Sequence, residues 1–125
     1  MKYMLLVYLD EHALSESERN ACYAESAELA QEIHKDARYV LAAPLHPTLT
    51  ATSVRVRESK SFVTDGPFAE TREQLGGFFL IDAADLDQAI QIASRIPAAR
   101  HGTVEIRPVM EVPGLPETDR TRRKD

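Results

Sequence analysis

The sequence predicts an α+β fold in which one antiparallel sheet carries two helices. The first observation is a set of four apolar segments of strand length. They are residues 2–9, 39–43, 77–82 and 103–112. The second observation is that two helix-start signals, at Ser15 and Asp85, lie between these segments. The third is an alternating pair of segments, 51–57 and 61–64, which predicts a β-hairpin.

The first strand and the first helix each have a clear local signal. Residues 2–9 are almost wholly apolar, so we expect a central strand that is buried on both faces. Ser15 and Glu18 form a Ser-x-x-Glu capping box, which predicts a helix that runs to about Asp36. Small or apolar residues recur on one face of that helix, and Cys22 among them is interpreted as a core residue. They are Cys22, Ser26, Leu29, Ala30, Ile33 and Ala37.

The middle of the chain predicts a second strand and then the hairpin. Pro44 ends the strand at residues 39–43. In the hairpin, Val54 and Val56 alternate with Arg55 and Arg57, so we expect one apolar face and one polar outer face. A short turn at residues 58–60 joins its two strands.

The last third of the chain predicts a second helix and a final strand. Asp85 and Gln88 form a second capping pair, and Pro97 stops the helix. Its predicted buried stripe is Leu86, Ala89, Ile90, Ala93 and Ile96. After a loop at residues 98–102, alternation predicts a strand over 103–112. Residues 113–125 are charged and without periodicity, which predicts a disordered tail.

Two helices against an antiparallel sheet in this order indicate a ferredoxin-like split β-α-β subunit with an added hairpin. We expect one domain over residues 1–112. The helices cover one face of the sheet, whereas the strands are apolar on both sides. A second copy of the chain is the simplest cover for the other face, so the sequence predicts a homodimer.

Composition and motifs exclude several functional classes. The net charge of −5 argues against direct binding to nucleic acid or an anionic membrane. Cys22 is the only cysteine, and His12, His34 and His46 have no metal-binding spacing, so we expect no metal. We expect no cofactor, because the chain has no phosphate-binding loop and no dinucleotide-binding motif. Without a signal peptide or an apolar segment of spanning length, the expected location is cytoplasmic.

Residues 64–79 concentrate the unusual backbone signals of the chain. The Asp65-Gly66-Pro67 sequence predicts a rigid turn, because glycine tolerates unusual dihedral angles and proline fixes its own. Gly76 and Gly77 then open an aromatic strand, where missing side chains permit a bulge or a close backbone approach. This loop is therefore the candidate site.

Asp65 and His101 are the candidate catalytic residues, as a carboxylate base or ligand and an imidazole acid–base group. Arg72, Arg100 and Glu70 are the candidate ligand-binding residues. We expect Asp65 at the mouth of a cleft, with Arg100 or His101 from a neighbouring element or the partner subunit. Ordinary structural roles stay open for all five: a turn cap for Asp65, and solvated, salt-bridged loops for the others.

Four segments resemble the DGPF-domain family, part of the YCII-related superfamily. The most specific is residues 64–78, TDGPFAETREQLGGF, and residues 1–6, 51–57 and 96–108 resemble the opening, hairpin and ending of the family. The resemblance implies a dimeric α+β barrel of ferredoxin-like subunits, and some relatives lie beside or are fused to sigma factors. YCII-type relatives carry a proposed His–Asp pair, and the place of that histidine falls near Ser26 here. A glycine usual after the first helix is also missing, at residues 36–38.

Two functional classes follow. The first is a homodimer with a small-molecule-binding cleft and acid–base catalysis, which the polar, turn-rich central loop favours. The second is a non-catalytic regulatory or interaction module associated with sigma-factor-type transcriptional regulation. The absence of a complete catalytic constellation favours that alternative.

Overall fold

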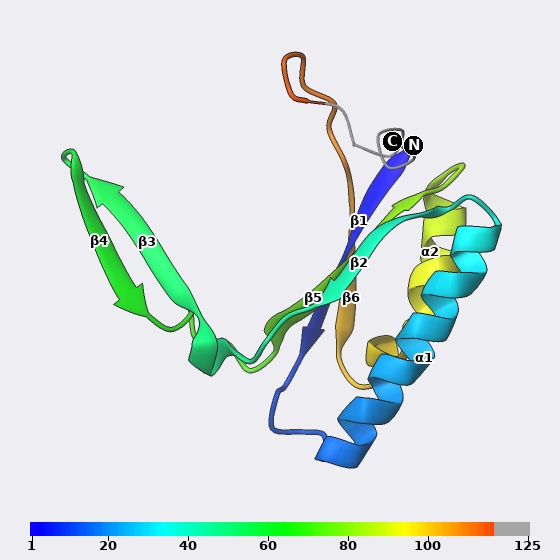
Figure 1. The fold of residues 1–125 in the computed structure, drawn as a ribbon, viewed down its shortest axis with the longest axis horizontal. Helices are drawn as coiled ribbons and strands as arrows, with labels where there is room; N and C mark the ends of the chain where they lie inside the picture. The colour runs from blue at the N-terminus through cyan, green and yellow to red at the C-terminus, as the bar shows by residue number, and fades with distance from the viewer. Residues whose placement is uncertain (117–125) are drawn as a thin grey trace, which may run out of the picture.

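A four-stranded antiparallel sheet carries both helices on one face in the computed structural model, which describes residues 1–116 (Figure 1). The strand order is β2-β5-β1-β6, and every neighbouring pair is antiparallel. This architecture agrees with the predicted ferredoxin-like α+β subunit. The four strands are β1 (Lys2–Leu9), β2 (Tyr39–Pro44), β5 (Gln74–Asp82) and β6 (Thr103–Pro108).

Strand β1 lies in the middle of the sheet, between β5 and β6. Tyr3, Leu5 and Val7 are buried beneath the helices, opposite Ile81 and Phe79 of β5. The expectation that both faces of β1 are buried was wrong for the subunit alone. The side chains of the other face are only half-buried, because no element within residues 1–116 covers them. We define the open face as the apolar residues on that side of the sheet: Met4, Leu6, Tyr8, Leu41, Phe78 and Leu80.

Helix α1 (Glu16–Lys35) begins at the predicted capping box. The Glu18 amide donates to the Ser15 hydroxyl at 3.1 Å, and the Ser15 amide donates to the Glu18 carboxylate at 2.8 Å. Leu29 and Ile33, in the second half of the helix, are buried against the sheet. The first half has no buried residue, so the helix rests on the sheet mainly through its C-terminal half.

Helix α2 (Leu86–Ser94) begins where the Asp85 carboxylate caps the Gln88 amide at 2.9 Å. The predicted stripe was partly wrong: Ala89, Ala93 and Ile96 are buried, but Leu86 and Ile90 are 51% and 45% exposed. Ile92 is buried in their place. One face of the helix, at helical spacing, carries residues 89, 92, 93 and 96. Leu86 and Ile90 lie beside that face. The predicted loop after α2 begins with a 3₁₀ helix, η2 (Pro97–Arg100).

The final strand is shorter than predicted. Strand β6 ends at Pro108 rather than at residue 112, because its partner β1 ends: Tyr3 pairs with Pro108, and the Val109 amide donates to the Lys2 carbonyl at 2.9 Å. Most of the predicted tail, residues 117–125, lies outside the described residues. Within residues 1–116, no helix is long and apolar enough to cross a membrane.

The predicted hairpin forms a separate two-stranded sheet of β3 (Thr52–Arg57) and β4 (Lys60–Asp65). We call residues 52–65 the arm. Glu58 and Ser59 have φ angles of 51° and 66°, so a two-residue turn closes its tip. At its base, the Gly66 amide donates to the Ala51 carbonyl at 2.7 Å. The arm projects to the side of the sheet away from the helices (Figure 1).

Candidate functional site

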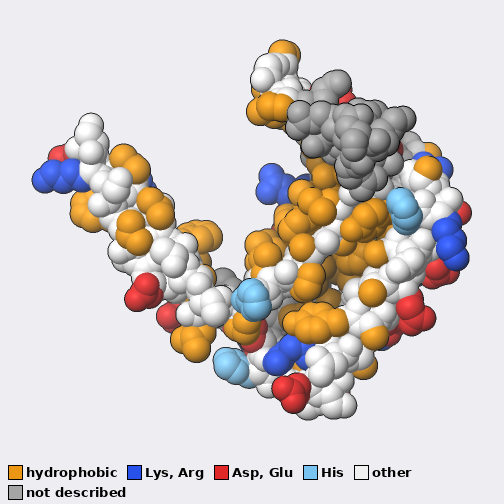
Figure 2. All heavy atoms as spheres, in the orientation of Figure 1, with side chains coloured by type: hydrophobic (Ala, Val, Ile, Leu, Met, Phe, Trp, Pro, Cys, Tyr) orange, Lys and Arg blue, Asp and Glu red, His pale blue; other side chains and the backbone are white. Residues whose placement is uncertain are grey.

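A cavity of about 680 Å³ lies between α1 and the sheet edge formed by β2 and β5. Its walls are built largely from residues whose side chains are too short to fill the space. Figure 2 shows hydrophobic side chains gathered in the hollow between the sheet and α1. Because α1 is anchored only through its second half, its first half leaves room above the sheet. The alanine and glycine residues of the wall are Ala27, Ala30, Ala42, Ala43, Gly76, Gly77 and Ala98.

The polar groups of this first cavity are neutral hydroxyls, an amide and an imidazole. Among residues 1–116, no Asp, Glu, Lys or Arg lines it. His34 and Tyr39 lie at one end with their rings edge to face, 5.8 Å apart between centroids and at 82°. Ser26, which occupies the place of the family histidine, also lines the cavity. The lining therefore suits an uncharged, largely apolar group with a few hydrogen-bonding atoms.

Cys22 lines the cavity as a half-buried thiol, so the interpretation of Cys22 as a core residue was wrong. It lies in the first half of α1, which the sheet does not cover. Partial burial raises the pKa of the Cys22 thiol above its ordinary value of 9.0. The thiol is therefore protonated at neutral pH and is a weak nucleophile.

A second cavity of about 750 Å³ adjoins the first. It lies between the loop after β1, the short 3₁₀ helix η1 (Thr48–Thr50) and the turn after β4. The two cavities adjoin through four shared lining residues, and we call the two together the joined cavity. The shared residues are Leu9, Cys22, Tyr23 and Gly76.

The second cavity is acidic, unlike the first. Within the described residues, four carboxylates and the guanidinium of Arg19 line it. Two of the four have structural roles: Glu11 accepts from the Thr48 amide and hydroxyl at 2.8 and 2.7 Å, and Asp10 accepts from the His12 amide at 2.9 Å. The other two, Asp65 and Glu70, accept no hydrogen bond within residues 1–116. They are therefore the carboxylates free to meet a ligand.

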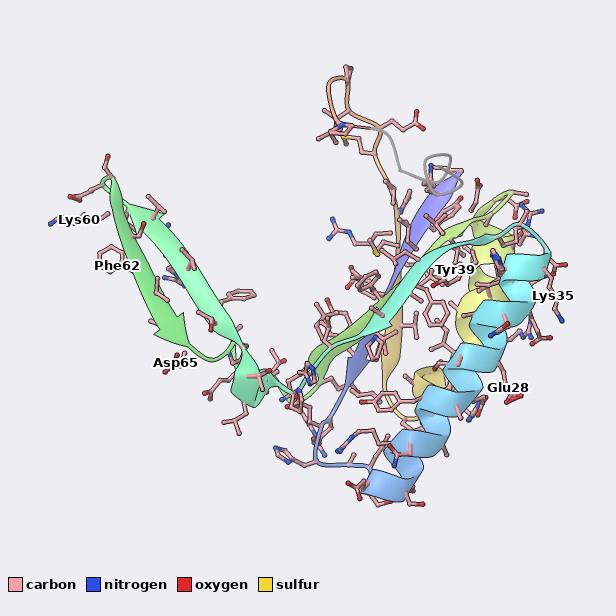
Figure 3. The ribbon with its side chains drawn as sticks, in the orientation of Figure 1. Glu28, Lys35, Tyr39, Lys60, Phe62 and Asp65 are labelled. Carbon is pink, nitrogen blue, oxygen red and sulfur yellow. The ribbon has the colours of Figure 1, made fainter. Side chains whose placement is uncertain are left out.

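Asp65 lies at the base of the arm, where β4 enters the turn (Figure 3). The turn is held by its backbone rather than by this carboxylate: the Gly66 amide donates to Ala51, and the Ser53 hydroxyl donates to the Gly66 carbonyl at 2.7 Å. Within residues 1–116, the Asp65 carboxylate therefore does not cap this turn. Across the part of the chain that the structure describes, no group of three or more His, Cys, Asp or Glu side chains is placed to hold a metal.

The other predicted site residues lie on different surfaces. Arg100, at the end of η2, donates to both carboxylate oxygens of Glu25 on α1, at 3.0 and 2.8 Å. His101 is exposed next to it, and neither residue lines the two cavities. Arg72 is exposed, with its Nε 3.9 Å from the Asp10 carboxylate. The structure thus places Asp65 and Glu70 in one cavity and Arg100 and His101 against α1, and the chemical roles of all five stay predictions.

Comparison with known proteins gives two matches. A family model described as the YCII-related domain matches residues 1–113. The uncharacterized protein R00369 of Rhizobium meliloti (strain 1021) is 36% identical over 114 residues, which cover 87% of this chain and 92% of the relative. The family match spans the sheet, both helices, the arm and both cavities.

Proposed function

The chain belongs to the YCII-related domain family, and from that premise we propose that it is a homodimer that binds a small molecule in the joined cavity. The observation that carries the proposal is the union of a neutral, mostly apolar cavity of about 680 Å³ with an acidic one of about 750 Å³. Small-molecule sites are typically concave and mostly apolar, with volumes of about 300–1,000 Å³ and a few placed polar groups.

The lining narrows the chemical class of the ligand. A largely apolar body suits the first cavity, with hydrogen bonds from groups such as Ser26 and Tyr39. A neutral or cationic end suits the second cavity, where Asp65 and Glu70 are free. Anionic compounds are disfavoured, because these carboxylates would repel them.

Acid–base catalysis in this site would fall to Asp65. Its carboxylate lines the second cavity without a hydrogen-bonding partner among residues 1–116, so it can accept a proton or hold a cation. The sequence predicted that Asp65 pairs with His101, but His101 is not among the residues that line this cavity. That pairing therefore stays a prediction, whereas Asp65 as a ligand contact is part of the proposal.

The homodimer is proposed to form through the open face. Met4, Leu6 and Phe78 are apolar and only half-buried at the centre of the sheet. A face of this kind is normally packed against another layer, and both helices already lie on the opposite side. A second copy would supply that layer by face-to-face packing of the two sheets.

A tryptophan placed at the junction of the two cavities tests ligand binding. The chain has no tryptophan, so Tyr23→Trp introduces a single fluorophore among the lining residues that both cavities share. A library that includes neutral and cationic ring compounds is first screened by the rise in melting temperature of the wild-type chain, since native-state binding raises stability. Each hit is then titrated against Tyr23→Trp and against Phe62→Trp, whose fluorophore lies on the arm outside both cavities.

The expected result is a saturable fluorescence change in Tyr23→Trp alone, together with slower alkylation of Cys22. Alkylation is read by mass spectrometry, and Cys22 is the only thiol in the chain. Hits that change Phe62→Trp equally, or that leave Cys22 as reactive as before, bind elsewhere and contradict the proposal. A library without a single hit favours the non-catalytic interaction module.

A further inference from the structure

The arm has the sequence pattern of a hairpin with one buried face. Val54 pairs with Val63, and Val56 lies two residues further along the same face. We call Val54, Val56 and Val63 the valine face. Strict alternation of apolar and polar residues is typical of a strand that is covered on one side. The opposite face of the arm is mostly polar and basic: Ser53, Arg55, Arg57, Lys60, Phe62 and Thr64.

No element among the described residues, 1–116, supplies that cover. Val54, Val56 and Val63 are 63%, 57% and 63% exposed, although β-branched apolar residues are normally buried. In the part of the chain that the structure describes, strands β3 and β4 pair only with each other, and the arm stands away from the sheet (Figures 1 and 3). An isolated two-stranded hairpin is at best marginally stable in water, so a partner surface would stabilise the arm.

Geometry favours a second copy of the chain as that surface. The arm projects on the same side as the open face, and its six-residue strands extend about 20 Å at about 3.3 Å per residue. Two sheets packed face to face lie about 10 Å apart, so the arm is long enough to pass the edge of a partner's sheet. The basic side chains Arg55, Arg57 and Lys60 lie on the opposite face of the arm, so they stay at the surface when the valine face docks.

We propose that the arm of each subunit docks its valine face on the second subunit, so that two arms clasp the dimer reciprocally. This inference rests on the proposed homodimer and adds a second, separate contact to the open face. It predicts that the arm is ordered and protected only when the partner is present.

Limited trypsin digestion over a range of protein concentrations tests the clasp. Arg55, Arg57 and Lys60 are exposed trypsin sites in the arm of a single subunit. We expect cleavage after these residues to slow by at least about tenfold as the protein concentration rises through the dimer dissociation constant. An arm that docks on its own subunit would instead be protected equally at every concentration, and that result overturns the inference.

A pair of arm variants gives a second readout. Val54→Thr with Val63→Thr keeps β-branched side chains, and hence strand propensity, but makes the valine face polar. We expect rapid arm cleavage at all concentrations and at least about tenfold weaker dimerisation, with the melting temperature of the dilute subunit unchanged. Thr64→Ser, on the opposite face of the arm, is the matched control and is expected to behave as the wild type.

The outcomes separate this inference from the proposed dimer. A wild-type dimer whose arm is cut equally fast at all concentrations, and whose dimerisation survives the double substitution, removes the clasp and leaves the dimer in place. A wild-type chain that stays monomeric at high micromolar concentration in sedimentation experiments removes both.

Discussion

Gly102 shows how a single missing side chain fixes the end of the sheet. A Cβ atom on this residue would overlap the Tyr8 carbonyl oxygen and crowd Leu9. We therefore expect Gly102→Ala to lower the free energy of unfolding by about 1–3 kcal/mol, as overpacking usually does. The difference in the free energy of unfolding is measured by urea denaturation. Gly76→Ala is the control, because its nearest neighbours would be 4.0 Å from the new methyl group, and equal losses in the two variants would refute the steric explanation.

The ion pair of Glu25 with Arg100 gives the protein a pH dependence on the acid side. The hydrogen bonds from Arg100 hold the pKa of the Glu25 carboxyl below its ordinary value of 4.5. A lowered pKa means that this contribution to stability is complete above about pH 4.5 and is lost as the pH falls through the folded-state value. When the pH is lowered from about 5.5 to about 3.5, we expect the melting temperature of Glu25→Gln to fall less than that of the wild type.

The control for Glu25 is Glu28→Gln on the same helix. Glu28 is exposed (Figure 3) and has no ion pair within residues 1–116. Its substitution is expected to leave the slope of melting temperature against pH close to that of the wild type. If Glu25→Gln and Glu28→Gln have the same slope, the ion pair does not cause the acid sensitivity.

At the scale of elements, the start of α1 depends on one hydroxyl. Ser15 satisfies the Glu18 amide, one of the four backbone donors that a helix start leaves without an internal partner. Ser15→Ala should therefore cost about 1 kcal/mol of unfolding free energy in urea. Ser17→Ala, one residue inside the helix, removes a hydroxyl that caps nothing and should cost clearly less. A loss at Ser17 as large as at Ser15 would contradict the capping role.

Elements with a local chemical cause could be predicted from the sequence. The start of each helix was predicted correctly, because the side chains of Ser15 and Asp85 cap the helices by accepting hydrogen bonds from backbone amides three residues later. The stripe of α2 was partly wrong because the side of a short helix that faces the sheet is set by tertiary packing. Strand β5 starts at Gln74, before the predicted Gly77, because β1 continues to pair with it past a register shift at Val7 and Tyr8.

At the scale of the whole molecule, the open face leads to a prediction about assembly. Light scattering should give twice the chain mass of 14.0 kDa for the wild type at micromolar concentration. Leu80→Lys places a charge at the centre of the open face, where dimer formation would bury it without a partner. We expect at least about hundredfold weaker dimerisation with a folded subunit, since Leu80 is half-exposed in that subunit.

Gln91→Lys is the control for Leu80→Lys. It adds the same charge on the exposed side of α2, away from the open face. It should dimerise as the wild type does. A Leu80→Lys chain that dimerises as tightly as Gln91→Lys would show that the open face is not the interface.

The candidate site could be predicted only in part, because it is a property of how whole elements meet. The sequence singled out the loop that carries Asp65 and Glu70, since unusual turn residues are visible locally. It missed Tyr23 and Tyr39, which become cavity residues because α1 and β2 meet with space between them. The sequence does contain one signal of the cavity, since α1 carries alanines on the side that faces Ala42 and Ala43 of β2. Periodicity alone predicts that such small residues are packed in the core.

The central place of β1 in the sheet also sets when the chain can fold during synthesis. Strand β1 is made first, yet one of its two neighbours is β6, about a hundred residues later. Ribosomes add that length in roughly 5–20 s, and for that time the most apolar strand has at least one unpaired edge. Nascent chains stalled before Thr103 should therefore be more sensitive to protease than chains stalled well beyond Pro108, once both have cleared the exit tunnel. Pairing of the first strand to be translated is therefore complete only after the last strand has left the ribosome.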